Sequence, residues 1–148
     1  TYQPTSGMSG CVDADQGNYV GESSQLIQTP CSKGTYQPST ASSECLSADA
    51  GYFVESTGAT EQTPCEAGSY QPVEGRSNCI YSSINNYVPE AGSAVQTACP
   101  SGEHQPTLGQ TGCVEKEDEG GLLPGFSSFF ALMALVGAAS MITSRKQN

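Results

Sequence analysis

Seven cysteines recur along this 148-residue chain at two alternating spacings. They are Cys11, Cys31, Cys45, Cys65, Cys79, Cys99 and Cys113, so a long interval such as Cys11 to Cys31 alternates with a short one such as Cys31 to Cys45. Thiols in a chain with so few large apolar residues are typical of disulfide bonds, which persist in an oxidising compartment. Zinc sites instead place two cysteines two to four residues apart and usually add histidine. We therefore expect disulfides, and neither a metal nor a cofactor. The alternative is a calcium site at residues 13–18, which carry Asp13 and Asp15, although the next copy keeps only Asp49.

The spacing alone leaves two periodic pairing schemes open, because seven cysteines cannot all pair within one chain. Pairing across the long interval joins Cys11 to Cys31 and leaves Cys113 over. Pairing across the short interval leaves Cys11 over and gives Cys31–Cys45, Cys65–Cys79 and Cys99–Cys113.

The other reactive side chains lack the partners that catalysis needs. His104 is the one histidine, and no recurring carboxylate or nucleophile accompanies it, so we expect a satisfied surface residue. The serines lie in expected turns and form no G-x-S-x-G or S-x-x-K motif. We therefore expect no enzymatic activity.

The charge is strongly acidic, with a formal net value of −10. Residues 1–114 hold 11 acidic and 2 basic residues, and so carry about −9. No basic patch is present that could neutralise phosphates, which excludes nucleic acid as a partner. The acidic surface favours a soluble, self-repelling array.

The elements that carry the cysteines form an internal repeat of 17 residues. Its motif is G-x-[YF]-x4-G, with the aromatic slot at Tyr2, Tyr19, Tyr36, Phe53, Tyr70, Tyr87 and, as histidine, His104. Cysteine pairs occur in every second copy, so the full period is twice this length. The other copies carry Ala14/Gln28, Ala48/Gln62 and Ser82/Gln96 at the two cysteine positions.

Units this short bury little apolar surface, so we expect a small core held by disulfides. Closing a 15-residue loop contributes roughly 3 kcal/mol in the chain-entropy model. Each unit is expected to be a short irregular hairpin: residues 52–55 form a strand, 56–59 a turn and 60–63 the returning strand. The aromatic residues are expected to pack across the disulfide or onto the next repeat. The fold class is therefore a disulfide-rich all-β or irregular tandem repeat forming an elongated rod.

The motif C-x2-G-x-Y, closed by a second cysteine as in Cys31 to Cys45, resembles the cysteine-rich modules of tumour-necrosis-factor receptors and ephrin-type receptors. The resemblance implies extracellular ladders of small disulfide-stapled β units, each closed on itself. The short interval also brackets one expected hairpin, whose turn would bring the two sulfurs within reach. We therefore expect pairing across the short interval, with Cys11 unpaired.

The repeat ends near residue 114, and an acidic, glycine-containing linker over residues 115–125 follows. Residues 126–142 carry no charge, and a helix of this length would be about 25 Å long, so we expect a transmembrane helix over 126–144. Arg145 and Lys146 in the basic end, 145–148, predict that this end stays cytoplasmic.

Pro124-Gly125-Phe126, together with the apolar stretch and basic end, resembles the PGF-type sorting tail of archaeal surface proteins. That resemblance implies recognition by a membrane sortase, removal of the helix and transfer to a lipid. The alternative is an ordinary single-span anchor.

The chain begins in the middle of a repeat, so we expect a C-terminal piece of a longer protein. The expected function is a stalk, anchored at the cell surface, that presents an upstream domain. The alternative is a receptor-like or adhesive module that binds a protein or a glycan.

Overall fold

The computed structural model describes residues 1–5, 7, 9–22 and 24–116, which belong to one unit, Thr1–Lys116. This unit is built from two-residue strands, without an α-helix among the described residues. The strands are β1 (Asn18–Tyr19), β2 (Thr29–Pro30), β3 (Thr35–Tyr36), β4 (Leu46–Ser47), β5 (Tyr52–Phe53), β6 (Thr63–Pro64), β7 (Ser69–Tyr70), β8 (Ile80–Tyr81), β9 (Asn86–Tyr87), β10 (Thr97–Ala98), β11 (Glu103–His104) and β12 (Val114–Glu115).

Consecutive strands pair in antiparallel fashion into six hairpins, all with the same register. In the β3–β4 hairpin, for example, Tyr36 lies opposite Leu46. An isolated bridge between Tyr2 and Val12 continues the same spacing before β1. The prediction that each unit is a short hairpin, including the unit over residues 52–63, is therefore confirmed.

The strands are shorter than the sequence indicated. In the third hairpin β5 ends at Phe53, and the returning strand is Thr63–Pro64 rather than residues 60–63. The segment between the two strands is irregular, and its turn contains Gly58 with a φ of 71°. Pro64 is the last residue of β6, where a missing N–H interrupts no longer ladder.

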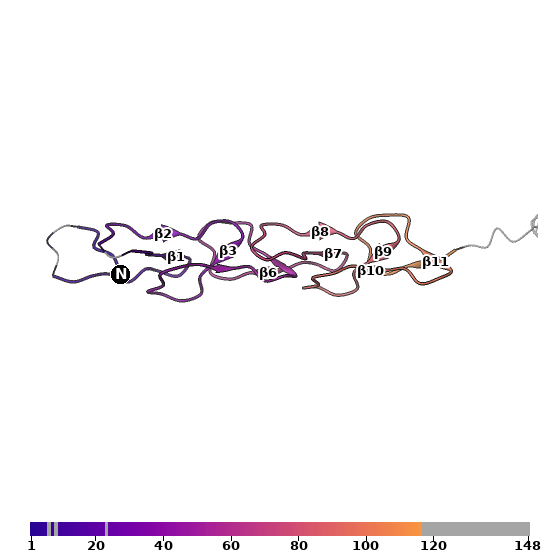
Figure 1. Cartoon of the computed structure of the whole chain (residues 1–148), viewed down its shortest axis with the longest axis horizontal. Coiled ribbons are helices and arrows are strands. Elements are labelled where there is room, and N and C mark those ends of the chain that lie inside the picture. The colour runs from indigo at the N-terminus through magenta and orange to yellow at the C-terminus, as the bar shows by residue number, and fades with distance from the viewer. Residues whose placement is uncertain (6, 8, 23, 117–148) are drawn as a thin grey trace, which may run out of the picture. The chain divides into compact units, whose positions relative to one another are not determined.

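Each hairpin is joined to the next by backbone hydrogen bonds that recur with the repeat. The N–H of the glycine before the first strand donates to a carbonyl of the next hairpin, as in Gly34 to Val54 at 2.8 Å and Gly51 to Gln71 at 2.7 Å. A second bond to the next hairpin runs from Gln37 N–H to the Ala59 carbonyl at 3.0 Å. The hairpins follow one another in chain order from β1 to β11 (Figure 1).

The first glycine of the motif also lies against the hairpin after next. A Cβ placed on Gly51 would collide with the backbone carbonyl oxygen of Gly92, and the same conflict pairs Gly34 with Gly75. Gly51 has a φ of 88°, in the left-handed region that favours glycine. The first glycine of the motif is therefore required because the backbones of hairpins two units apart approach each other closely at this position.

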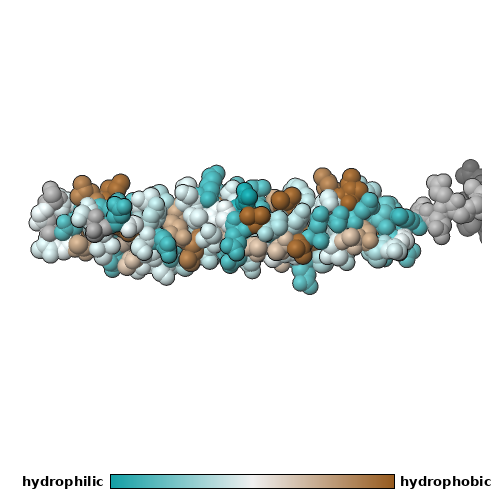
Figure 2. Space-filling model, viewed as in Figure 1, coloured by the Kyte–Doolittle hydropathy of each residue, from teal (hydrophilic) through white to brown (hydrophobic). Residues whose placement is uncertain are grey.

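The core is thin and made of small side chains, as the composition predicted. Its buried apolar members are Ala14, Val20, Cys31, Ala48, Val54, Cys65 and Val88. On the face seen in Figure 2, hydrophobic residues form separate small groups among polar ones. The chain is thus a small disulfide-rich all-β repeat protein over its described residues.

Candidate functional site

The second, fourth and sixth hairpins are closed by disulfides, and we call them disulfide-closed hairpins. The structure joins Cys31 to Cys45, Cys65 to Cys79 and Cys99 to Cys113, each across a sequence separation of 14. Their Cα–Cα distances are 5.7 to 5.8 Å, the usual range for a bridge. Cys11 is an exposed free thiol.

The hairpins β1–β2, β5–β6 and β9–β10 contain no cysteine, and we call them cysteine-free hairpins. In the second of these, Gln62 closes the loop on Asp49. The Oε1 atom of Gln62 accepts from the Asp49 backbone N–H at 2.6 Å, and its Nε2 donates to Asp49 Oδ2 at 2.6 Å. Gln28 and Asp15 make the same two bonds at 2.7 Å each.

The third cysteine-free hairpin is closed by a neutral version of this pair. Gln96 Oε1 accepts from the Ser83 backbone N–H at 2.7 Å and from the Ser83 hydroxyl at 3.1 Å. Serine stands here in place of the aspartate of the two earlier hairpins, so a carboxylate acceptor is missing. Hydrogen bonds to an ionised partner are the stronger kind, and this closure is therefore the weakest of the three.

These glutamines occupy the position that the second cysteine holds in the disulfide-closed hairpins, one repeat before Cys45, Cys79 or Cys113. The first cysteine position is taken by Ala14, Ala48 or Ser82, each fully buried, while the following residue binds the glutamine. The repeat pattern shows that alanine or serine and glutamine replace the two cysteines, but it does not reveal the hydrogen bonds that these glutamines make. The available signal was the acid or serine that directly follows the first cysteine position in these copies.

A second set of glutamines spans the loops of the disulfide-closed hairpins. Gln37, Gln71 and Gln105 are 3 to 6% exposed. Their Nε2 atoms donate to a carbonyl seven residues on, at 2.7 to 2.8 Å, and their Oε1 atoms accept a backbone N–H two residues on. Since buried amides must be bonded on both sides, these side chains hold the two arms of the loop together. The equivalent buried residues in the cysteine-free hairpins are Val20, Val54 and Val88.

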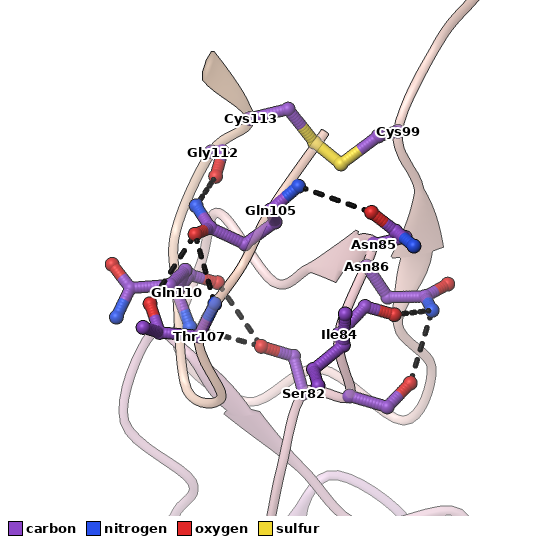
Figure 3. Close-up of a disulfide and its surroundings, with 11 residues drawn as sticks. Ser82, Ile84, Asn85, Asn86, Cys99, Gln105, Thr107, Gln110, Gly112 and Cys113 are labelled. Carbon is purple, nitrogen blue, oxygen red and sulfur yellow. Dashed lines mark hydrogen bonds between the residues drawn. A yellow bond between two sulfur atoms is a disulfide. The ribbon is translucent and has the colours of Figure 1, made fainter. Parts of the chain in front are cut away.

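The fifth hairpin departs from the repeat at Ser82 and Asn85, and both side chains bind the sixth hairpin (Figure 3). The Ser82 hydroxyl accepts from the Gln110 N–H at 3.0 Å and donates to the Gln110 carbonyl at 3.3 Å. The Oδ1 atom of Asn85 accepts from the Gln105 N–H at 3.3 Å. The two residues that break the repeat therefore make hydrogen bonds that hold the hairpin containing Cys99–Cys113.

The recurring aromatic residues are half-buried. Tyr19, for example, lines an open hollow together with Thr35, Glu44 and Cys45 of the next hairpin. His104 takes the same slot in the sixth hairpin and is also half-buried. Its Nδ1 atom is buried and has no hydrogen-bond partner within the described residues, so the expectation of a satisfied surface histidine was wrong.

Two expected features of the C-terminal region lie outside the described residues: the sorting motif Pro124-Gly125-Phe126 and the helix over 126–144 that is followed by Arg145 and Lys146. Within the described part of the chain, no helix combines the length and apolar character needed to cross a bilayer. Nor do three His, Cys, Asp or Glu side chains converge on a possible metal position among those residues.

Comparison of the chain with protein-family models and with curated proteins finds no match.

Proposed function

We propose that this chain is a spacer at the cell surface, which holds an upstream domain away from the membrane. The observation that carries the proposal is the uniformity of the junctions between hairpins. The backbone hydrogen bond from the first residue of the motif to the next hairpin recurs at five successive positions, from Gly17 to Gln37 through to Asn85 to Gln105, at 2.7 to 2.9 Å. A surface specialised for one ligand would instead differ between repeats.

The same junctions support an elongated array. Each hairpin bonds to the next in chain order, so addition of a repeat extends the stack rather than widening a core. The acidic surface opposes collapse of one array onto another. Disulfides at a fixed period support folding in an oxidising, extracellular compartment.

Attachment to the membrane is the function we assign to the C-terminal region. The uncharged stretch over residues 126–142 and the basic pair Arg145-Lys146 support an anchor whose C-terminal end is cytoplasmic. Pro124-Gly125-Phe126 supports processing by a membrane sortase with transfer to a lipid. The resemblance to receptor-type cysteine-rich modules is consistent with repeats that face outward.

The location is tested by the mass of the native protein recovered from membranes. A polypeptide ending near Pro124 and carrying a lipid is expected if the sorting signal operates. A mass ending at Asn148 would indicate a retained anchor, and recovery from the soluble cytosol would contradict both.

The spacer role is tested by changing the length of the array. Deletion of residues 48–81 removes one full period, a cysteine-free hairpin and a disulfide-closed one, and joins Ser47 to Ser82. The distance from a fluorophore on the N-terminus to the membrane should fall by roughly 25 to 35 Å, if each unit advances about one strand length. An unchanged distance would refute the spacer, and the undeleted protein with the same label is the control.

A receptor-like or adhesive module is the second candidate, and exposed aliphatic residues favour it. An aliphatic residue directly follows the later cysteine of each short interval and the unpaired Cys11. These residues are Val12, Leu46, Ile80 and Val114, and their side chains are 39 to 50% exposed. Binding of a protein or glycan at this row would be lost when all four are changed to threonine, the residue at the equivalent position of the cysteine-free hairpins. Retention of ligand by that variant would exclude the row as the binding surface.

A further inference from the structure

The covalent path along the array is much shorter than the polypeptide. The three disulfides each bypass the whole loop between their two cysteines. Between Cys31 and Cys113 this leaves two stretches of polypeptide that no bridge bypasses, from Cys45 to Cys65 and from Cys79 to Cys99. A force applied at the ends of the chain is therefore carried by these two stretches and by the bridges.

Each of these stretches contains one cysteine-free hairpin. The first contains β5–β6 and the second β9–β10. Each is closed by two pairs of facing strand residues and by the glutamine contacts at Asp49 or Ser83, and all of those contacts are non-covalent. The glutamine closures are exposed to water, which competes for their hydrogen bonds.

We propose that the array is an extensible spacer whose stretch is limited by its alternate disulfides, an inference that rests on the proposed spacer function. Under tension the cysteine-free hairpins open and, when tension falls, refold. The disulfide-closed hairpins keep their ends within a Cα–Cα distance of 5.7 to 5.8 Å. Because closed and opening units alternate along the chain, each opened hairpin remains flanked by folded ones on which it can re-form its junctions.

The geometry fixes the limit of extension. Each straightened stretch between bridges is about 70 Å long, so the segment from Cys31 to Cys113 reaches about 160 Å with its disulfides. Without them the same segment would reach roughly 290 Å. The disulfides thus reduce the maximum extended length of this segment by nearly half.

The order of opening also follows from the contacts. The β9–β10 hairpin is closed through the neutral Ser83, whereas the β5–β6 hairpin is closed through the carboxylate of Asp49. Hydrogen bonds to an ionised group are the stronger kind. We therefore expect β9–β10 to open at the lower force.

Single-molecule force measurements on the full chain, held by peptide tags at both ends, test the proposal. The wild type is compared with the double variant Cys65→Ser, Cys79→Ser, in which one bridge is absent. Its total contour length should exceed that of the wild type by the length of the released loop less one bridge, or about 40 to 45 Å. Opening events below that limit should reverse on relaxation in the wild type.

A third protein, Asp49→Ser, makes the β5–β6 closure resemble that of β9–β10 and should lower the opening force of β5–β6 alone. Glu61→Gln, an exposed change beside Gln62, is its matched control. Loss of the entire array in one event, or equal contour lengths with and without the 65–79 bridge, would overturn the proposal. These outcomes do not depend on where the protein resides in the cell. The spacer function itself is tested separately, by the change in the length of the array.

Discussion

The side-chain oxygen of Asn85 accepts a hydrogen bond from the backbone N–H of Gln105 at 3.3 Å (Figure 3). In the earlier disulfide-closed hairpins the equivalent N–H groups, those of Gln37 and Gln71, donate instead to backbone carbonyls of the following hairpin, at Ala59 and Ser93. The counterpart for Gln105 would be residue 127, outside the described residues. The Gln105 N–H is therefore bonded by a side chain of the preceding hairpin, whereas its two counterparts are bonded by the backbone of the following one.

The role of Asn85 predicts different outcomes for two substitutions at this position. Asn85→Ala removes the acceptor and keeps a β-carbon at a φ of 61°, so it should lower the free energy of unfolding by about 2 kcal/mol. Asn85→Gly also loses the acceptor but relieves the backbone, and should cost less than about 1 kcal/mol. Urea titration of both variants measures the difference. An alanine variant as stable as the wild type would contradict this role.

The close approach of Gly51 to Gly92 predicts that a single methyl group disrupts the stack. Gly51→Ala adds a steric conflict with a backbone oxygen to an unfavourable φ of 88° and should destabilise the array by about 3 kcal/mol or more. Gly102→Ala is the matched control, because Gly102 has a φ of 91° but no atom of the described residues within 4 Å of the position that a Cβ would take. It should cost about 1 to 2 kcal/mol. Equal thermal shifts would show that the approach is unimportant.

The glutamine closure predicts a local loss of protection from hydrogen exchange. Gln62→Ala removes the acceptor of the Asp49 N–H and should speed exchange of that amide about fivefold, equivalent to roughly 1 kcal/mol at this exposed position. Gln96→Ala should have a smaller effect on Ser83, since no carboxylate is involved. Glu61→Ala is the control for a change in the same segment before β6, and equal exchange in it and Gln62→Ala would argue against the closure.

The equivalence of the two closures predicts that one can replace the other. Ala48→Cys combined with Gln62→Cys places thiols at the positions of Cys31 and Cys45, and the backbone pairing of β5–β6 has the same register as that of β3–β4. A fourth disulfide should form, seen as the loss of two hydrogens in the intact mass. It should add roughly 3 kcal/mol, less the contribution of the glutamine. Recovery of both thiols in reduced form under oxidising conditions would contradict the equivalence.

The proposed elongated shape of the array predicts a scattering profile unlike that of a globular domain. If each unit advances about 12 to 17 Å, residues 1–114 would span on the order of 80 to 120 Å. The radius of gyration of the array should then exceed about 25 Å, whereas a globular domain of this size gives about 13 to 14 Å. Small-angle X-ray scattering separates these values, and a result near the lower one would refute the proposed shape.

Much of the fold follows from spacing in the sequence. The period of 17 residues located every hairpin, and the short cysteine intervals bracket the hairpins that the structure closes with disulfides. Local residue types also indicated where strands and turns lie, as at Tyr52 and Gly58. These features depend on neighbours in the chain, or on a covalent bond whose span is a fixed number of residues.

The partners of the polar side chains were decided by the tertiary structure. Gln28 and Gln62 looked like neutral replacements of cysteine, and their bonds to Asp15 and Asp49 become visible only once the two arms of the hairpin meet. The buried state of Gln71 likewise depends on the loop that folds around it.

The sequence by itself determined the repeat, its hairpins and the candidate disulfide pairs, because those are set by intervals along one chain. The tertiary structure alone decided why Gly51 must be glycine. A Cβ at Gly51 would meet the backbone carbonyl oxygen of Gly92, two hairpins further along the chain. Contacts between units two apart are set by how the hairpins stack, and no local pattern of residue types specifies that distance.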